Sequence, residues 1–106
     1  MPIGTPTGLG SAFNANNTAV VNITTTAAIV AGNTVLVLVS IGARSLSVTS
    51  ISDGTNTYTN AFRTTNGTAA GEIWYCLAAS AVATSATLAV NLSGTSVTAT
   101  VLANAC

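Results

Sequence analysis

Hydrophobic and polar positions alternate in short runs along this chain, and no helical period of 3.6 residues persists. The densest run covers residues 33–41, where β-branched residues and leucines occupy both parities: Val35, Leu36, Val37, Leu38, Val39 and Ile41. Apolar residues on both parities predict a central strand that is buried on both faces.

Shorter runs on either side predict further strands. Residues 20–25 alternate as a first strand, and residues 27–30 suggest a short second one. Leu46 and Val48 are two residues apart and therefore lie on the same face of a strand, whereas Ile51 falls on the opposite face. A bulge near Ser50 would bring all three to one face, so a bulge is predicted there. Two inward rows complete the chain: Leu88, Val90 and Leu92, then Val97, Ala99, Val101 and Ala103.

Turn residues separate these runs. The clearest turn is Asp53-Gly54-Thr55-Asn56, and Tyr58, Asn60 and Phe62 follow it on one face of the next strand. The same four residues resemble half of a calcium loop, but a calcium site needs more carboxylates, so the turn is the favoured interpretation. Turns every 8 to 12 residues predict an all-β fold: one antiparallel β-sandwich of seven or eight strands, jelly-roll-like, with an immunoglobulin-like Greek key as the alternative.

Several residues are assigned structural roles. Val37 and Leu88 lie on rows interpreted as core. Trp74 and Tyr75 are neighbours on a strand and point to opposite faces, so core packing is favoured over a shared sugar-stacking platform. Arg63 and Glu72 flank the Asn66-Gly67 turn, which predicts a cross-strand ion pair of small value if it is exposed.

The two cysteines leave two interpretations open. Cys76 lies within a strand and Cys106 at the end of the chain. They form a disulfide if the protein meets an oxidising environment, or Cys76 is a buried free thiol and Cys106 is incidental. Two thiols without histidine cannot complete a tetrahedral metal site, so no metal is expected.

Residues 1–17 differ in composition from the rest of the 106-residue chain. They are rich in Gly, Pro, Asn, Ser and Thr, and Ile3, Leu9 and Phe13 are the large apolar residues among them. This composition predicts a flexible N-terminal arm over residues 1–17, whose three apolar residues bind a partner, followed by one β-sandwich domain over residues 18–106.

The scarcity of charged residues excludes several classes of function. Two arginines, two acidic residues and no histidine make up 4% of the chain, while 49% is hydrophobic. Two cations cannot neutralise a run of phosphates, so no nucleic acid is expected as a partner. The titratable groups are too few for catalysis, so neither an enzyme nor a cofactor is expected. The densest apolar run is far shorter than the ~20 residues of a spanning helix, and the first residues do not read as a secretory signal, so no membrane partner and synthesis in the cytoplasm are expected.

Several runs of the chain resemble a recurrent β-sandwich module of structural proteins in tailed bacteriophages and bacterial surface proteins. The resemblance rests on residues 31–39, 48–53, 56–58 and 73–75, and spans about residues 19–103. It implies a non-enzymatic virion protein, made in the host cytoplasm. The expected role is a capsid decoration (cement) protein on the capsid exterior that binds the major capsid protein, or other virion proteins, as a homo-oligomer such as a trimer. The alternatives are a glycan- or receptor-binding module of a tail fibre and a subunit of a bacterial surface adhesin or filament.

Overall fold

The computed structural model describes residues 7–14, 19–77, 79–94 and 99–105. Within these ranges the chain forms antiparallel strands and no helix. The strands, in chain order, are β1 (Thr7–Asn14), β2 (Val20–Thr24), β3 (Val35–Ile41), β4 (Val48–Ser52), β5 (Thr59–Asn66), β6 (Ala69–Cys76), β7 (Thr87–Leu92) and β8 (Ala99–Ala105). The all-β prediction is confirmed.

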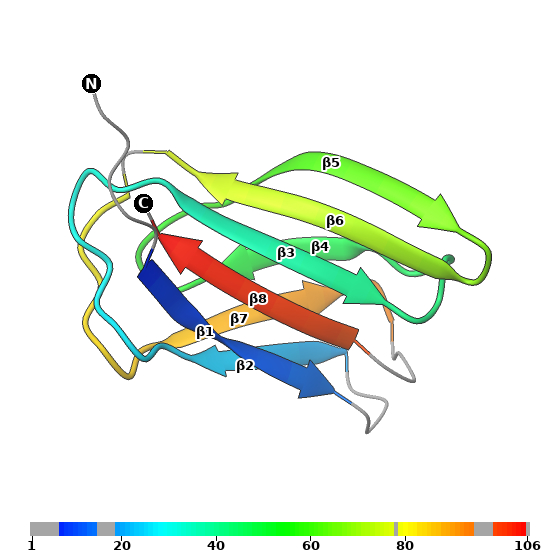
Figure 1. Cartoon of the computed structure of the whole chain (residues 1–106), viewed down its shortest axis with the longest axis horizontal. Coiled ribbons are helices and arrows are strands. Elements are labelled where there is room, and N and C mark those ends of the chain that lie inside the picture. Colours follow the sequence, from blue (N-terminus) through cyan, green and yellow to red (C-terminus); the bar gives the residue numbers. More distant parts are fainter. Residues whose placement is uncertain (1–6, 15–18, 78, 95–98, 106) are drawn as a thin grey trace.

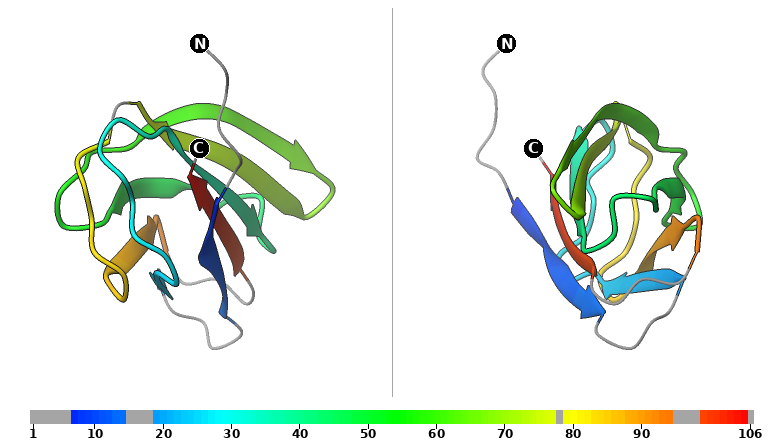
Figure 2. Two further views of the ribbon diagram at one scale, coloured as in Figure 1. Left: turned by 60° about the vertical axis from the view of Figure 1, so that its left-hand side comes forward. Right: turned by 90° about the vertical axis from the view of Figure 1, so that its right-hand side faces the viewer.

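Two sheets form the sandwich. The larger has the strand order β1-β8-β3-β6-β5, and the smaller has the order β2-β7-β4. Figure 1 shows the five-stranded sheet in front of the three-stranded sheet, and the turned views in Figure 2 separate the two layers. As predicted for residues 33–41, β3 is the central strand of its sheet, paired with β6 on one side and β8 on the other.

The strand order is that of a jelly roll with one strand moved. Strands β1 and β8, β2 and β7, and β3 and β6 are paired, as in a rolled-up antiparallel ribbon. The fourth pair of such a ribbon, β4 with β5, does not form between these strands; Ser52, at the end of β4, makes a single bridge with Thr57, which precedes β5. Strand β5 instead pairs with β6 and widens the larger sheet to five strands.

The core lies between the sheets and is formed by inward residues of every strand except β5, which has no buried residue. Val37 and Leu88 are fully buried there, which confirms the rows assigned from the sequence. Trp74 and Cys76 of β6 also face this core, and Tyr75 lies between them on the opposite, half-buried side. The bulge in β4 falls between Val48 and Ser50, close to the predicted position.

Strand β1 corrects the expectation of an arm for residues 7–14. These residues pair with β8 along their length, and the side chain of Leu9 is 0% exposed. Gly10 permits this arrangement because it has a φ of 131°, and a Cβ there would lie 2.9 Å from the Cγ2 of Ile23 in β2. Leu9 is therefore part of this chain's own core, and its expected role in binding a partner is wrong.

Three further expectations differ from the structure. Residues 27–30 form no strand; Ile29 makes an isolated bridge with Val82. A bulge between Asn60 and Phe62 shifts the register by one residue. Phe62 therefore points outward, whereas Tyr58 is buried and Asn60 donates a hydrogen bond inward. The third difference is that β3 is buried on one face only, because nothing in the described chain covers its outward leucines.

Candidate functional site

The outward side of the five-stranded sheet carries several exposed large apolar side chains, among them Leu38, Phe62 and Leu102. The residues that point outward from this sheet, here called the outer face, include Gly8, Ser11, Leu36, Leu38, Ser40, Thr59, Phe62, Thr64, Gly71, Ile73, Tyr75, Thr100, Leu102 and Asn104. Leu38 is 41% exposed and Phe62 is 56% exposed. The strand register places Leu102, Leu38, Ile73 and Phe62 side by side across four strands.

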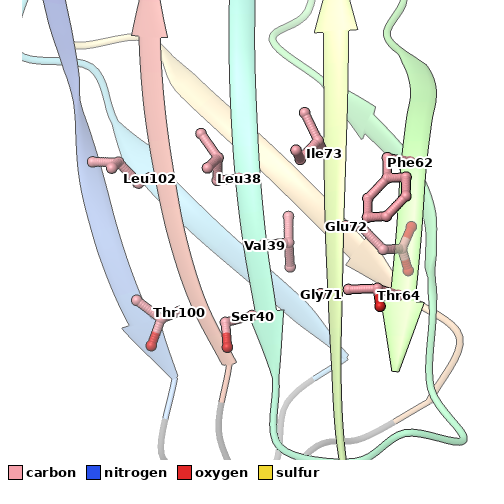
Figure 3. A pocket seen from close by; sticks show the side chains of 10 residues that line it. All are labelled: Leu38, Val39, Ser40, Phe62, Thr64, Gly71, Glu72, Ile73, Thr100 and Leu102. Atoms are coloured by element: carbon pink, nitrogen blue, oxygen red, sulfur yellow. The ribbon is translucent and has the colours of Figure 1, made fainter. Parts of the chain in front are cut away.

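A shallow hollow of about 330 Å³ lies in this face. Figure 3 shows Leu102, Leu38, Ile73 and Phe62 along one side of the hollow, and the hydroxyl-bearing Thr100, Ser40 and Thr64 along the other. Gly71 forms part of its floor, and the absence of a side chain there leaves the space open. The hollow suits an apolar group, since aliphatic and aromatic carbon dominates its lining.

No charged side chain points into the outer face. The chain has four charged residues, and each makes hydrogen bonds elsewhere within the chain. Arg44, in the loop between β3 and β4, donates to the backbone oxygen of Gly67 and to the hydroxyl of Thr65. The other three charged residues form two clusters.

Glu72 is the centre of the first cluster. Its carboxylate, on the core side of β6, accepts hydrogen bonds from the backbone N–H of Val48 (2.8 Å), the Asn60 amide (2.8 Å), Arg63 (2.7 Å) and the Trp74 indole (2.9 Å). These donors come from both sheets, so the carboxylate joins β4 to β5 and β6. The predicted pair of Arg63 and Glu72 is confirmed, but it is partly buried, with the Glu72 side chain 2% exposed and that of Arg63 32% exposed.

Asp53 is the centre of the second cluster, in the turn after β4. It accepts hydrogen bonds from the backbone N–H groups of Thr55 and Asn56, from the Asn56 amide and from the Tyr58 hydroxyl. Asn56 also exchanges two hydrogen bonds with the backbone of Ser80, which ties this turn to the loop after β6. The turn interpretation of residues 53–56 is confirmed.

The hydrogen bonds around Asp53 set its ionisation. Burial alone raises the pKa of Asp53, but the donors from Asn56, Thr55 and Tyr58 outweigh it and hold the pKa below its ordinary value. Burial, followed by the negative charge of Asp53, raises the pKa of Tyr58 well above its usual range. The same two causes raise the pKa of Cys76. Asp53 is therefore ionised near neutral pH, while Tyr58 and Cys76 remain protonated.

These two clusters link strands and loops of the fold. Each carboxylate is saturated by donors from its own chain, and the Cys76 thiol is buried and in its neutral form. No group of three or more possible metal ligands occurs among the described residues. No helix in the part of the chain that the structure describes is long and apolar enough to cross a membrane.

The residues predicted to bind a partner do not form a described site. Ile3 lies outside the described residues, and so does the Phe13 side chain, although the Phe13 backbone pairs with Thr100. Cys106 also lies outside them, so its pairing stays a prediction. The outer face was not predicted, because apolar residues at both odd and even positions of β3 suggested that both faces of the strand are covered.

Comparisons with protein-family models, with curated proteins and with solved structures found no significant match to this chain.

Proposed function

We propose that this chain is a non-enzymatic structural protein of a virion, a capsid decoration protein that binds the major capsid protein on the exterior of a bacteriophage head. The supporting observation is that all four charged side chains make hydrogen bonds within the chain itself. The remaining surface is made of aliphatic, hydroxyl and amide groups. Such a surface binds another protein without the cost of removing water from a charge.

The composition supports a fixed place in an assembly rather than a free monomer. A net charge of zero gives two copies no electrostatic repulsion, and such proteins depend on their neighbours for solubility. Jelly rolls occur among viral capsid proteins and lectins alike, so the strand order is compatible with the proposal but does not carry it.

The proposal is tested by sedimentation with capsids. Purified chain is mixed with capsids assembled from the major capsid protein that the same genome encodes, and the bound fraction is measured against concentration. We expect saturation at a fixed ratio of chain to capsid protein. We also expect the occupancy to change little between about 0.05 M and 0.5 M salt, because screening weakens charge contacts and leaves apolar ones. Absence of the chain from the capsid pellet at every concentration would overturn the proposal.

A glycan- or receptor-binding module of a tail fibre is the second candidate. It is favoured by the exposed ring of Phe62 beside the hydroxyls of Ser40, Thr64 and Thr100 in the hollow. A sugar presents an apolar face to a ring and hydroxyls to polar neighbours. Binding of the isolated chain to immobilised cell-surface polysaccharide, lost in Phe62→Ala and kept in the loop variant Val30→Ala, would favour this function over decoration.

A further inference from the structure

We propose that two copies of this chain associate through their outer faces, sheet against sheet, as a two-fold symmetric dimer. This inference goes beyond the decoration function and does not depend on it. It rests on the apolar row across the sheet, the lack of charge on that face, the area available and the condition of the sheet edges.

The apolar row is continuous. Leu102 pairs with Leu38, Leu38 with Ile73, and Ile73 with Phe62, so apolar side chains cross β8, β3, β6 and β5 without a polar interruption. A contiguous exposed apolar patch often marks a protein–protein interaction site. A second sheet stacked at about 10 Å covers such a row, as the two sheets of a sandwich cover each other.

Charge favours a second copy as the occupant. A two-fold axis places the same surface on both sides, so a charge on the face would be buried against that surface or, close to the axis, would meet its own copy. The outer face carries none, because Arg63 and Glu72 point to the core side of β5 and β6 and Asp53 lies in the turn after β4. A partner with a charged surface finds no complement here, whereas an identical uncharged face fits without penalty.

The area is sufficient for a stable pair. Five strands about 4.8 Å apart, each rising about 3.3 Å per residue over seven residues, give a face of roughly 24 Å by 23 Å, or about 550 Å². Two such faces bury about 1,100 Å² when they cover each other completely, before the relief of the side chains is counted, and a specific interface requires roughly 1,000 Å². The hollow above Gly71 adds to this area when an apolar side chain of the opposite copy fills it.

The edges of the sheet are less suitable for association than its face. Strand β1 has an irregular register between Gly8 and Gly10, and β5 has one between Asn60 and Phe62. Bulges of this kind interrupt the row of free backbone groups that edge pairing needs. The position of β5 makes the face more suitable for association, because it adds the exposed ring of Phe62 to the larger sheet.

The test is the mass of the full chain in solution, measured by sedimentation across a dilution series that starts at about 100 µM, where even a weak dimer is populated. We expect the mass of two chains at high concentration, with dissociation on dilution. Phe62→Lys and Leu38→Lys each bury an unpaired positive charge in the proposed interface, so each should shift the protein to the mass of one chain. Val30→Lys is the matched control, since Val30 is 62% exposed in a loop outside the five-stranded sheet.

Thermal melting and far-ultraviolet circular dichroism establish that each variant is folded, and Phe62→Lys is the safer of the two because it lies on an edge strand. A wild-type chain that is monomeric at the highest concentration overturns the dimer, even if it decorates capsids. An assembly of any size that persists in both folded lysine variants overturns it as well. A dimer that fails to bind capsids leaves this inference standing and overturns the decoration function instead.

Discussion

Arg63 reaches over the edge of the sandwich so that its Nη1 lies 2.7 Å from the Oε2 of Glu72, whose side chain is almost entirely buried while that of Arg63 is 32% exposed. The guanidinium also donates to the backbone oxygen of Arg44. The pair therefore joins the β5–β6 hairpin to the loop between β3 and β4. It accounts for the move of β5 into the larger sheet, because the carboxylate on β6 holds both Arg63 and Asn60 of β5.

Replacement of this carboxylate should destabilise the fold. In Glu72→Gln an amide NH₂ group replaces one of the two carboxylate oxygens that accept hydrogen bonds in the wild type. At least one buried donor therefore loses its acceptor. We expect a loss of about 1 to 3 kcal/mol in the free energy of unfolding, measured by chemical denaturation. Arg44→Met removes surface hydrogen bonds and should change stability by less than about 1 kcal/mol. Equal effects of the two substitutions would contradict the central role of Glu72.

The core rows give a second prediction. Val37→Ala and Leu88→Ala each remove buried methyl groups from fully enclosed positions, so each should cost about 2 to 4 kcal/mol. Thr57→Ala, at an exposed position, is the control and should be nearly neutral. If Val37→Ala proved as harmless as Thr57→Ala in urea denaturation, the packing of β3 described above would be incorrect.

Stability should change little with pH near neutrality and fall at both extremes. The pKa of Asp53 is held below its ordinary 3.8, so its contribution is present above that value and is lost as the pH falls through the folded pKa. The pKa values of Cys76 and Tyr58 are raised from 9.0 and 10.0, so their contributions are present below those values and are lost as the pH rises above them. Melting temperatures between about pH 5 and 8 should be constant. A marked fall within that window would contradict this ionisation scheme.

Tyr58 offers a direct test of the Asp53 cluster. Tyr58→Phe removes the hydroxyl that donates to Asp53 at 3.0 Å, which should cost about 1 to 3 kcal/mol at neutral pH. The pKa of Asp53 should rise towards its ordinary value, because one donor that stabilises the carboxylate is lost. Tyr75→Phe, on the outer face, is the matched control and should leave the acid side of the stability profile unchanged. An unaltered pKa of Asp53 in Tyr58→Phe, measured by NMR titration, would rule out this coupling.

Alternation along the sequence was sufficient to predict most of the strands and the core. It placed Val37 and Leu88 correctly because each strand keeps a period of two between its bulges. It failed at Phe62, where one extra residue in β5 reverses the facing, and no local signal marks that bulge. It also failed at Leu36 and Leu38, because the sequence of a strand does not reveal what lies over its second face.

The buried Glu72 shows a different limit. A single acidic residue in a strand usually lies at the surface, and only its pairing with Arg63 could be predicted from the residues around it. The other donors come from β4, β5 and β6, and one of them, the backbone N–H of Val48, is brought to the carboxylate by the packing of the opposite sheet. The burial of Glu72 depends on how the two sheets pack, and neither the composition nor the spacing of residues predicts that packing.

Strand β1 leads to the last prediction. Its glycine-rich, polar sequence resembles a linker, yet residues 7–14 pair with β8 and Leu9 fills the core. Deletion of residues 2–13 should therefore unfold or aggregate the protein, since it removes a core side chain and exposes the edge of β8. Leu9→Ala should cost about 2 to 5 kcal/mol, whereas Ser11→Ala, at an exposed position of the same strand, should be nearly neutral. If the truncated protein melted cooperatively at the wild-type temperature, β1 would contribute nothing to the stability of the sandwich. Residues 1–17 would then behave as the arm that their composition predicts.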